Sequence, residues 1–136
     1  HRAVVIGVDI SGLRTRGQLR TTLRDIEVQC VVLCGRLTVL EHIFIIVNGS
    51  QAISEDTAHR ICESTAMRLH ARLEQACARS IGITVVLAEH CADHKRLADR
   101  VIARARRREC LDTAIALHWK DIAHTPIGTV GANTYL

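Results

Sequence analysis

Two acidic residues lie in or next to apolar segments, where they could support metal chemistry. Asp9 stands near the end of the run Ala3–Ile10, whose β-branched residues predict a buried strand. Glu41 lies within a second apolar segment, 37–47, which also predicts a strand. Carboxylates on neighbouring strands can hold two divalent cations that bridge a triphosphate. Simpler roles stay open, since Asp9 could cap a helix and Glu41 could face solvent.

The spacing of apolar residues predicts the elements that would position these acids. Residues 28–33 and 37–47 predict two strands separated by a short turn, which indicates a hairpin. The full order predicts an α+β, ferredoxin-like βαββαβ domain with an antiparallel sheet, followed by an extra C-terminal helix and β-hairpin. In chain order, the predicted elements are a strand at 3–10, a helix at 13–25, strands at 28–33 and 37–47, a helix from Glu55, a strand at 83–88, a helix after Asp93, and strands at 111–117 and 128–136.

Length and composition limit the classes of protein to consider. The 136 residues, of which 48% are apolar, predict a single domain over 1–136, with a core at 3–108 and a C-terminal extension at 109–136. The chain begins with His1 and not with Met, so we expect it to be a piece of a longer protein. Aromatic residues make up only 2%, which argues against nucleic-acid modules that stack bases, and the net charge of +4 is mild. No apolar stretch is long enough to span a membrane, so we expect no membrane contact by this fragment and a cytoplasmic location.

Six cysteines occur, and none of them forms a CxxC pair. Free cysteine behaves as a small buried hydrophobe, so we predict mostly reduced, packed thiols. His59 and Cys62 lie three residues apart and share a helix face, which makes them the first metal ligands to test.

Two segments lie beside the predicted acids: residues 8–13, VDISGL, which follow the first predicted strand, and Val39–Ile43, which contain Glu41. They resemble, in order, the segment after the first strand and the signature of the GGDEF domains of diguanylate cyclases, which share the nucleotide cyclase and palm-like topology. Residues 79–85, RSIGITV, resemble the family's SIGIA strand, and residues 97–106 resemble its closing helix. The resemblance extends over about residues 3–108.

The resemblance implies a site for a nucleoside triphosphate with Mg²⁺ or Mn²⁺. Backbone amides at a helix start would receive phosphate, and a carbonyl would complete the metal ligands. The residues that match are Asp9, Ile10 and Glu41 for the metal, with Asp9 and Glu41 as residual catalytic candidates, and Gly12, Leu13 and Arg106 for the nucleotide.

The signature itself departs from the family pattern. Val39 and Leu40 replace two glycines that let the nucleotide approach the backbone, and His42 replaces a glutamate. We therefore predict a catalytically degenerate GGDEF-like signalling or regulatory domain that makes no cyclic di-GMP. It would form a homodimer or bind a partner signalling domain through apolar surface near Trp119 and Tyr135, and it would hold a nucleotide only weakly.

Other interpretations stay open at this point. Residues 55–89, with Ala58 and His59 at a helix start, resemble the zinc-sensing cytosolic dimerisation domain of cation diffusion facilitators. Residues 116–133 faintly resemble a segment of class III nucleotide cyclases. An active nucleotide cyclase that uses Asp9 and Glu41, or a plain ferredoxin-like regulatory module, are the remaining alternatives.

Overall fold

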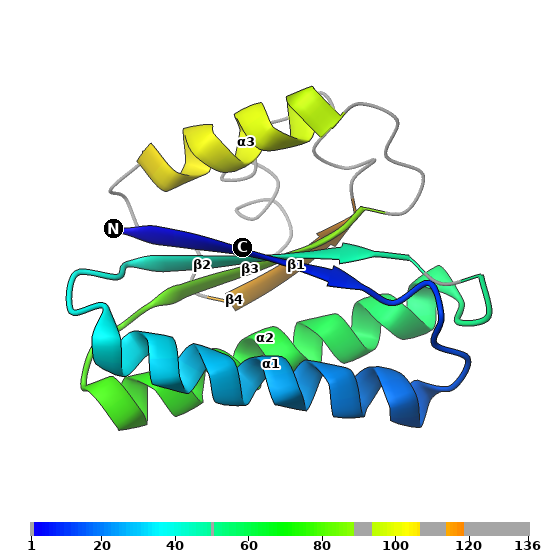
Figure 1. The fold of residues 1–136 in the computed structure, drawn as a ribbon, viewed down its shortest axis with the longest axis horizontal. Coiled ribbons are helices and arrows are strands. Elements are labelled where there is room, and N and C mark those ends of the chain that lie inside the picture. Colours follow the sequence, from blue (N-terminus) through cyan, green and yellow to red (C-terminus); the bar gives the residue numbers. More distant parts are fainter. Residues whose placement is uncertain (1, 50, 89–93, 107–113, 119–136) are drawn as a thin grey trace.

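Strands and helices alternate along the whole described part of the chain (Figure 1). The computed structural model describes residues 2–49, 51–88, 94–106 and 114–118. The elements are β1 (Ala3–Asp9), α1 (Arg16–Arg36), β2 (His42–Asn48), α2 (Glu55–Cys77), β3 (Gly82–Leu87), α3 (His94–Arg106) and β4 (Ala114–His118).

The strands form one parallel sheet in the order β1-β2-β3-β4. Its register places Ala3 opposite His42 and Asp9 opposite Asn48. Helices α1 and α2 cover one face of the sheet, and α3 lies on the other (Figure 1). Because the strand order advances in one direction, the crossover through α3 has the opposite hand to the other two, a departure from the nearly universal right-handed rule.

This architecture corrects the predicted antiparallel ferredoxin-like sheet. The predicted strand at 28–33 is the C-terminal half of α1, so no hairpin joins it to β2. Its valines suggest a strand locally, but the helical spacing of Leu19, Leu23, Cys30 and Cys34 buries one stripe of α1 while Val28 and Val32 face solvent. A helix in place of a strand returns the chain to the end of the sheet at which β1 began, so β2 starts there too and runs parallel to β1.

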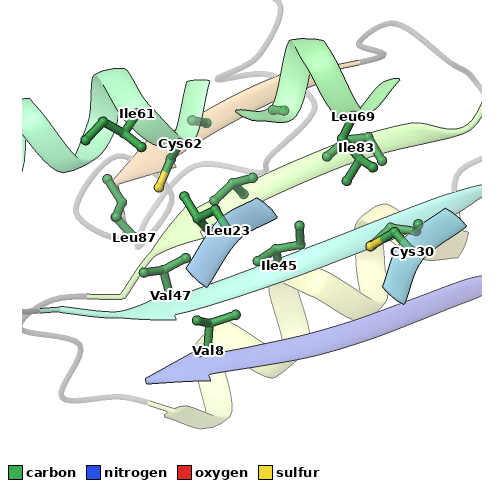
Figure 2. Packing of buried hydrophobic residues seen from close by; sticks show 14 of the residues in the cluster. Val8, Leu23, Cys30, Ile45, Val47, Ile61, Cys62, Leu69, Ile83 and Leu87 are labelled. Carbon is green, nitrogen blue, oxygen red and sulfur yellow. The ribbon is translucent and has the colours of Figure 1, made fainter. Parts of the chain in front are cut away.

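Two apolar layers hold the molecule together. The larger layer lies between the sheet and the pair α1 and α2, where Leu23 and Cys30 meet Ile45 and Ile83 (Figure 2). The smaller layer packs α3 on the opposite face; its buried members are Phe44, Val86, Ala88, Leu97, Val101, Ile115 and Leu117. The near-continuous apolar strands are typical of a parallel sheet that is covered on both faces.

A buried carboxylate ties α1 to α2. Glu27 is 3% exposed and accepts hydrogen bonds from the Arg68 guanidinium at 2.6 and 2.9 Å, and Arg72 lies 3.6 Å away. Burial raises the pKa of the neighbouring Cys30 thiol to about 11, with a smaller contribution from the negative charge of Glu27. This ion pair serves helix packing, and the Cys30 thiol stays protonated at neutral pH.

Several predicted boundaries are confirmed and others lie outside the described residues. Ser54 caps α2 as predicted, while α1 begins three residues later than expected, after Thr15. The cap at Asp93, the final strand at 128–136, and Trp119 and Tyr135 lie outside the described ranges. None of the described helices has both the length and the apolar run that crossing a bilayer requires.

Candidate functional site

A polar hollow lies at the carboxyl end of the sheet, where the loops after β1 and β2 lead into α1 and α2. Its volume is about 540 Å³, and its lining residues are Arg14, Thr15, Arg16, Ala52, Ile53, Ser54 and Thr57. The two helices that begin at the hollow, α1 and α2, lie on the same face of the sheet (Figure 1). Ligands of open parallel sheets bind at the carboxyl ends of the strands, which is the end where the hollow lies.

Local hydrogen bonding brings two helix starts to this hollow. The Thr15 hydroxyl accepts from the Gln18 amide at 3.1 Å, and the Gln18 side chain accepts from the Thr15 amide at 3.2 Å, which completes a capping box. The Ser54 hydroxyl accepts from the Thr57 amide at 3.3 Å. Both helices therefore begin at fixed positions, and their positive dipole ends meet at the hollow.

Two arginines give the hollow its charge. Arg14 and Arg16 are exposed, and neither joins an ion pair with any residue that the structure describes. The first turn of α1 contains no acidic residue, whereas the first turn of α2 contains Glu55 and Asp56. Glu55 and Asp56 do not line the hollow, so the side formed by α1 is the more favourable one for an anion.

Asp9 lies at this same end of the sheet, at the end of β1. Its Oδ1 accepts a hydrogen bond from the Ser11 amide at 2.9 Å. Hydrogen bonds from Ser11, the backbone one first, lower the pKa of the Asp9 carboxyl, which is fully exposed. The carboxylate therefore shapes the turn after β1, as an Asx-turn does.

The predicted phosphate seat at Gly12 and Leu13 does not coincide with a helix start. The Leu13 amide donates to the Ile10 carbonyl at 3.0 Å, and α1 begins only after Thr15. The Ile10 carbonyl, predicted as a metal ligand, thus accepts a hydrogen bond within the turn, and its side chain is fully buried. Gly12 is exposed in the same turn.

Glu41 lies at the other end of the sheet from Asp9. Its amide donates to the Arg2 carbonyl at 2.7 Å, just before β2 begins, whereas Asp9 pairs with Asn48 at the end of β2. Seven residue steps separate these positions along the strands at about 3.3 Å each, so the two acids are more than about 20 Å apart. Two bridging cations need a spacing of about 4 Å, so these acids do not fit a shared Mg²⁺ or Mn²⁺ site.

The remaining predicted ligands are also spread over the molecule. Arg106 ends α3, on the opposite sheet face from α1, and the structure describes only its backbone. The ring of His59 contacts the Ala116 carbonyl at 2.9 Å and stacks on His118 with centroids 4.7 Å apart, while Cys62 is buried in the core. Among the described ranges, no three His, Cys, Asp or Glu residues gather as metal ligands would.

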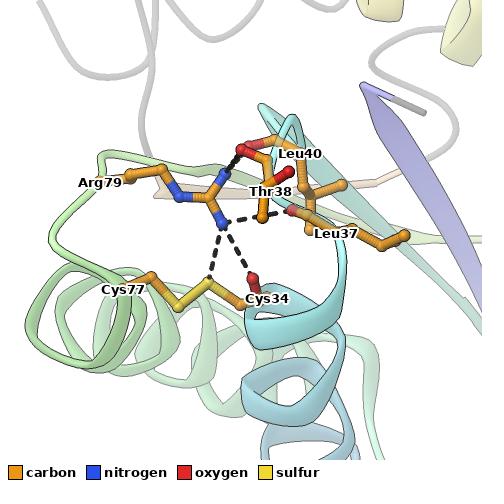
Figure 3. Close-up of a disulfide and its surroundings, with 6 residues drawn as sticks. All are labelled: Cys34, Leu37, Thr38, Leu40, Cys77 and Arg79. Carbon is orange, nitrogen blue, oxygen red and sulfur yellow. Dashed lines mark hydrogen bonds between the residues drawn. A yellow bond between two sulfur atoms is a disulfide. The ribbon is translucent and has the colours of Figure 1, made fainter.

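The amino end of the sheet is closed by one arginine and a disulfide (Figure 3). The Arg79 guanidinium donates to the carbonyl of Cys34 in the last turn of α1 and to those of Leu37, Thr38 and Leu40 just after it. Cys34 and Cys77 form a disulfide between the C-terminal ends of α1 and α2, which corrects the expectation of reduced thiols for this pair. Cys30 is free and buried, as predicted, and Cys62 is buried.

His42, predicted to replace a glutamate of the family signature, is part of this closed end. It is 6% exposed, its Nε2 lies 2.7 Å from the Thr84 hydroxyl, and its ring stacks on Phe44. A Cβ on Gly82 would lie 2.5 Å from the imidazole, so only glycine leaves room for it. The His42 ring thus occupies the space that Gly82, its partner on β3, leaves open.

Sequence reasoning missed Arg14 and Arg16. A signal was present, because Thr15 and Gln18 have the spacing of a capping box, which marks a helix start. Two arginines around such a cap indicate an anion site when a second helix start lies beside them, and that second condition depends on the tertiary fold.

Comparisons with family models, with curated proteins and with solved structures find no match to this chain. The resemblance to GGDEF domains stays a prediction, and the parallel sheet lacks the hairpin that the resemblance implies.

Proposed function

We propose that this chain is a non-catalytic regulatory domain that binds a phosphorylated small molecule in the hollow between the starts of α1 and α2. The observation that carries the proposal is the pair Arg14 and Arg16 at the meeting of two helix N-termini. Guanidinium groups and helix starts are both preferred contacts of phosphate. Nucleoside triphosphates are the ligand class that the family resemblance implies, and a partner signalling domain would read out their binding.

The positions of the acids support a binding role over cyclase chemistry. Asp9 and Glu41 lie at opposite ends of β1 and β2, so they do not form the carboxylate pair of a two-metal reaction. A divalent cation would instead arrive with the triphosphate, and Asp9 is the predicted metal ligand at the same end as the hollow. The expected cytoplasmic location stays a prediction, and the Cys34–Cys77 disulfide weighs against it because disulfides are typical of oxidising compartments.

Calorimetric titration with tripolyphosphate, GTP and ATP, with and without Mg²⁺, tests the proposal. We expect the affinity to fall as the salt concentration rises. We also expect the double variant Arg14→Ala/Arg16→Ala to bind at least about tenfold more weakly than the wild type, because each charge-assisted contact contributes about 1.5 kcal/mol or more. Arg24→Ala/Arg36→Ala removes the same charge from exposed positions of α1 away from the hollow and should bind normally.

Three outcomes would contradict the proposal. One is the absence of binding to any of the three compounds. Another is equal loss of affinity in both double variants, which would indicate an effect of net charge alone. Formation of a cyclic dinucleotide from GTP by the same preparation would contradict the non-catalytic role.

A further inference from the structure

The outer edge of β1 has the features of a self-pairing strand. Among the described residues, β1 pairs only with β2, so no strand of the described ranges covers the other side of β1. Edge strands in monomeric proteins usually carry lysine, proline or a bulge that prevents pairing. The sequence of β1, AVVIGVD, contains no lysine and no proline, and its single charge is at its last residue.

The backbone groups on this edge are the odd-numbered ones. The His42 amide donates to the Arg2 carbonyl at 3.0 Å, and the Ile10 amide donates to the Asn48 carbonyl at 3.1 Å, so even-numbered residues point toward β2. Backbone direction alternates along a strand. The amides and carbonyls of Ala3, Val5, Gly7 and Asp9 therefore point outward.

Two neighbouring positions on one face of β1 differ in size: the side chain of Val5 protrudes, and Gly7 leaves an open space. Val5 is 56% exposed and lies on the sheet face of α3, where that helix does not reach it. Gly7 is exposed on the same face, and a Cβ built on it meets nothing within 4 Å. Val5 and Gly7 are two residues apart on the same face of β1, so an exposed side chain lies next to a position with no side chain.

We infer that the chain forms a twofold dimer in which the β1 strands of two copies pair antiparallel and the sheets join into one. A twofold axis at Ile6 places Val5 of each copy opposite Gly7 of the other and pairs outward backbone groups with outward backbone groups. The same axis places Asp9 opposite Ala3, so no like charges face each other. A second copy of β1, running antiparallel, places its Gly7 against the protruding Val5 and its Val5 against the open space at Gly7. The inference does not depend on ligand binding.

The flank of α1 extends the same surface. Glu27 marks the side of α1 that faces α2, and Ile26 and Leu33 lie more than a quarter turn from it, on the side away from α2. Both side chains are half-buried and are seven residues apart, which is two helical turns. They would add apolar contact below the joined strands, which the strand edge alone lacks.

Sedimentation velocity over a concentration series tests the dimer with a matched pair of variants. Val5→Lys places a charge on the edge, and Met67→Lys makes the same change at a side chain of α2 that is 57% exposed. We expect Val5→Lys to weaken association at least about tenfold, or about 1.4 kcal/mol, and Met67→Lys to leave it unchanged. A wild-type chain that stays monomeric at every concentration, or a dimer that Val5→Lys does not weaken, would overturn the inference.

Amide hydrogen exchange of the wild-type chain gives a second test that needs no variant. On concentration, the amides of Val5 and Gly7 should become protected, whereas those of Val4 and Ile6, which already point toward β2, should not change. An unchanged pattern at Val5 and Gly7 in a sample that sediments as a dimer would place the interface elsewhere and reject the β1 edge.

Discussion

The two ends of the parallel sheet use their polar residues in different ways. At the amino end, Arg79 donates to four backbone carbonyls, and His42 is buried against Thr84. At the carboxyl end, Arg14 and Arg16 are exposed around a hollow, and no described residue pairs with them. The guanidinium at the amino end thus stabilises the fold through backbone carbonyls, whereas Arg14 and Arg16 at the carboxyl end are the groups that the proposed ligand would contact.

The starts and the ends of α1 and α2 lie at opposite ends of the sheet. Helices α1 and α2 each run from the carboxyl end of the sheet to its amino end, because each follows a parallel strand and leads to the next. Their starts therefore gather at one end and their ends at the other. Substitution of Arg79 after the helix ends should change the free energy of unfolding, while substitution of Arg14 and Arg16, which do not cap the helix starts, should change the affinity for the proposed ligand.

The largest effect is expected at Arg79. Arg79→Ala leaves several carbonyls after α1 without a donor, and we expect the free energy of unfolding to fall by about 3 kcal/mol, since charged hydrogen bonds contribute about 1.5–3 kcal/mol and are not additive. Arg79→Lys should lose part of this, because one ammonium cannot reach the same carbonyls as a planar guanidinium. Urea denaturation measures both, and equal stability of the alanine variant and the exposed control Arg60→Ala would contradict this account of the amino end.

A pair of glycines compares the two ends directly. Gly82→Ala would place a Cβ 2.5 Å from the His42 ring, and overpacking of this kind costs about 1–3 kcal/mol. Gly12→Ala, at the carboxyl end, meets nothing within 4 Å and should be neutral or stabilising by up to about 1 kcal/mol. Thermal unfolding of the two variants side by side gives the measurement. Equal destabilisation by both would mean that the ends do not differ in packing.

How much of this fold follows from the sequence depends on one segment. Strands at 3–10 and 83–88 and a helix capped by Ser54 follow from periodicity and capping, and the structure confirms them within a few residues. Residues 28–33 have the β-branched composition of a strand, and only packing against the sheet makes them helical. Because that segment decides whether a helix or a hairpin precedes β2, its misassignment changes the whole sheet from parallel to antiparallel.

The candidate site follows the same logic. Asp9 was predicted at a strand end, and it lies there, but its prediction as a partner of Glu41 depended on a hairpin that would have brought the two strands together in opposite directions. In a parallel sheet, a residue at the start of β2 and a residue at the end of β1 lie far apart. Arg14 and Arg16 become candidates only when α2 begins beside α1, which no local pattern predicts.

The smallest effect is expected at Asp9, and it concerns pH. The pKa of this carboxyl is lowered in the folded chain by hydrogen bonds from Ser11, so the native state favours the ionised form. Its contribution is therefore present above the pKa of the unfolded chain and is lost as pH falls through the lower folded pKa. Asp9→Asn retains a side chain that can close the turn but removes the charge, so the difference in stability between wild type and variant should shrink as pH falls from 7 to 3. Urea denaturation at several pH values measures this difference. A difference in the free energy of unfolding that stays constant or grows toward low pH would show that the Asp9 carboxylate does not stabilise the turn at the carboxyl end.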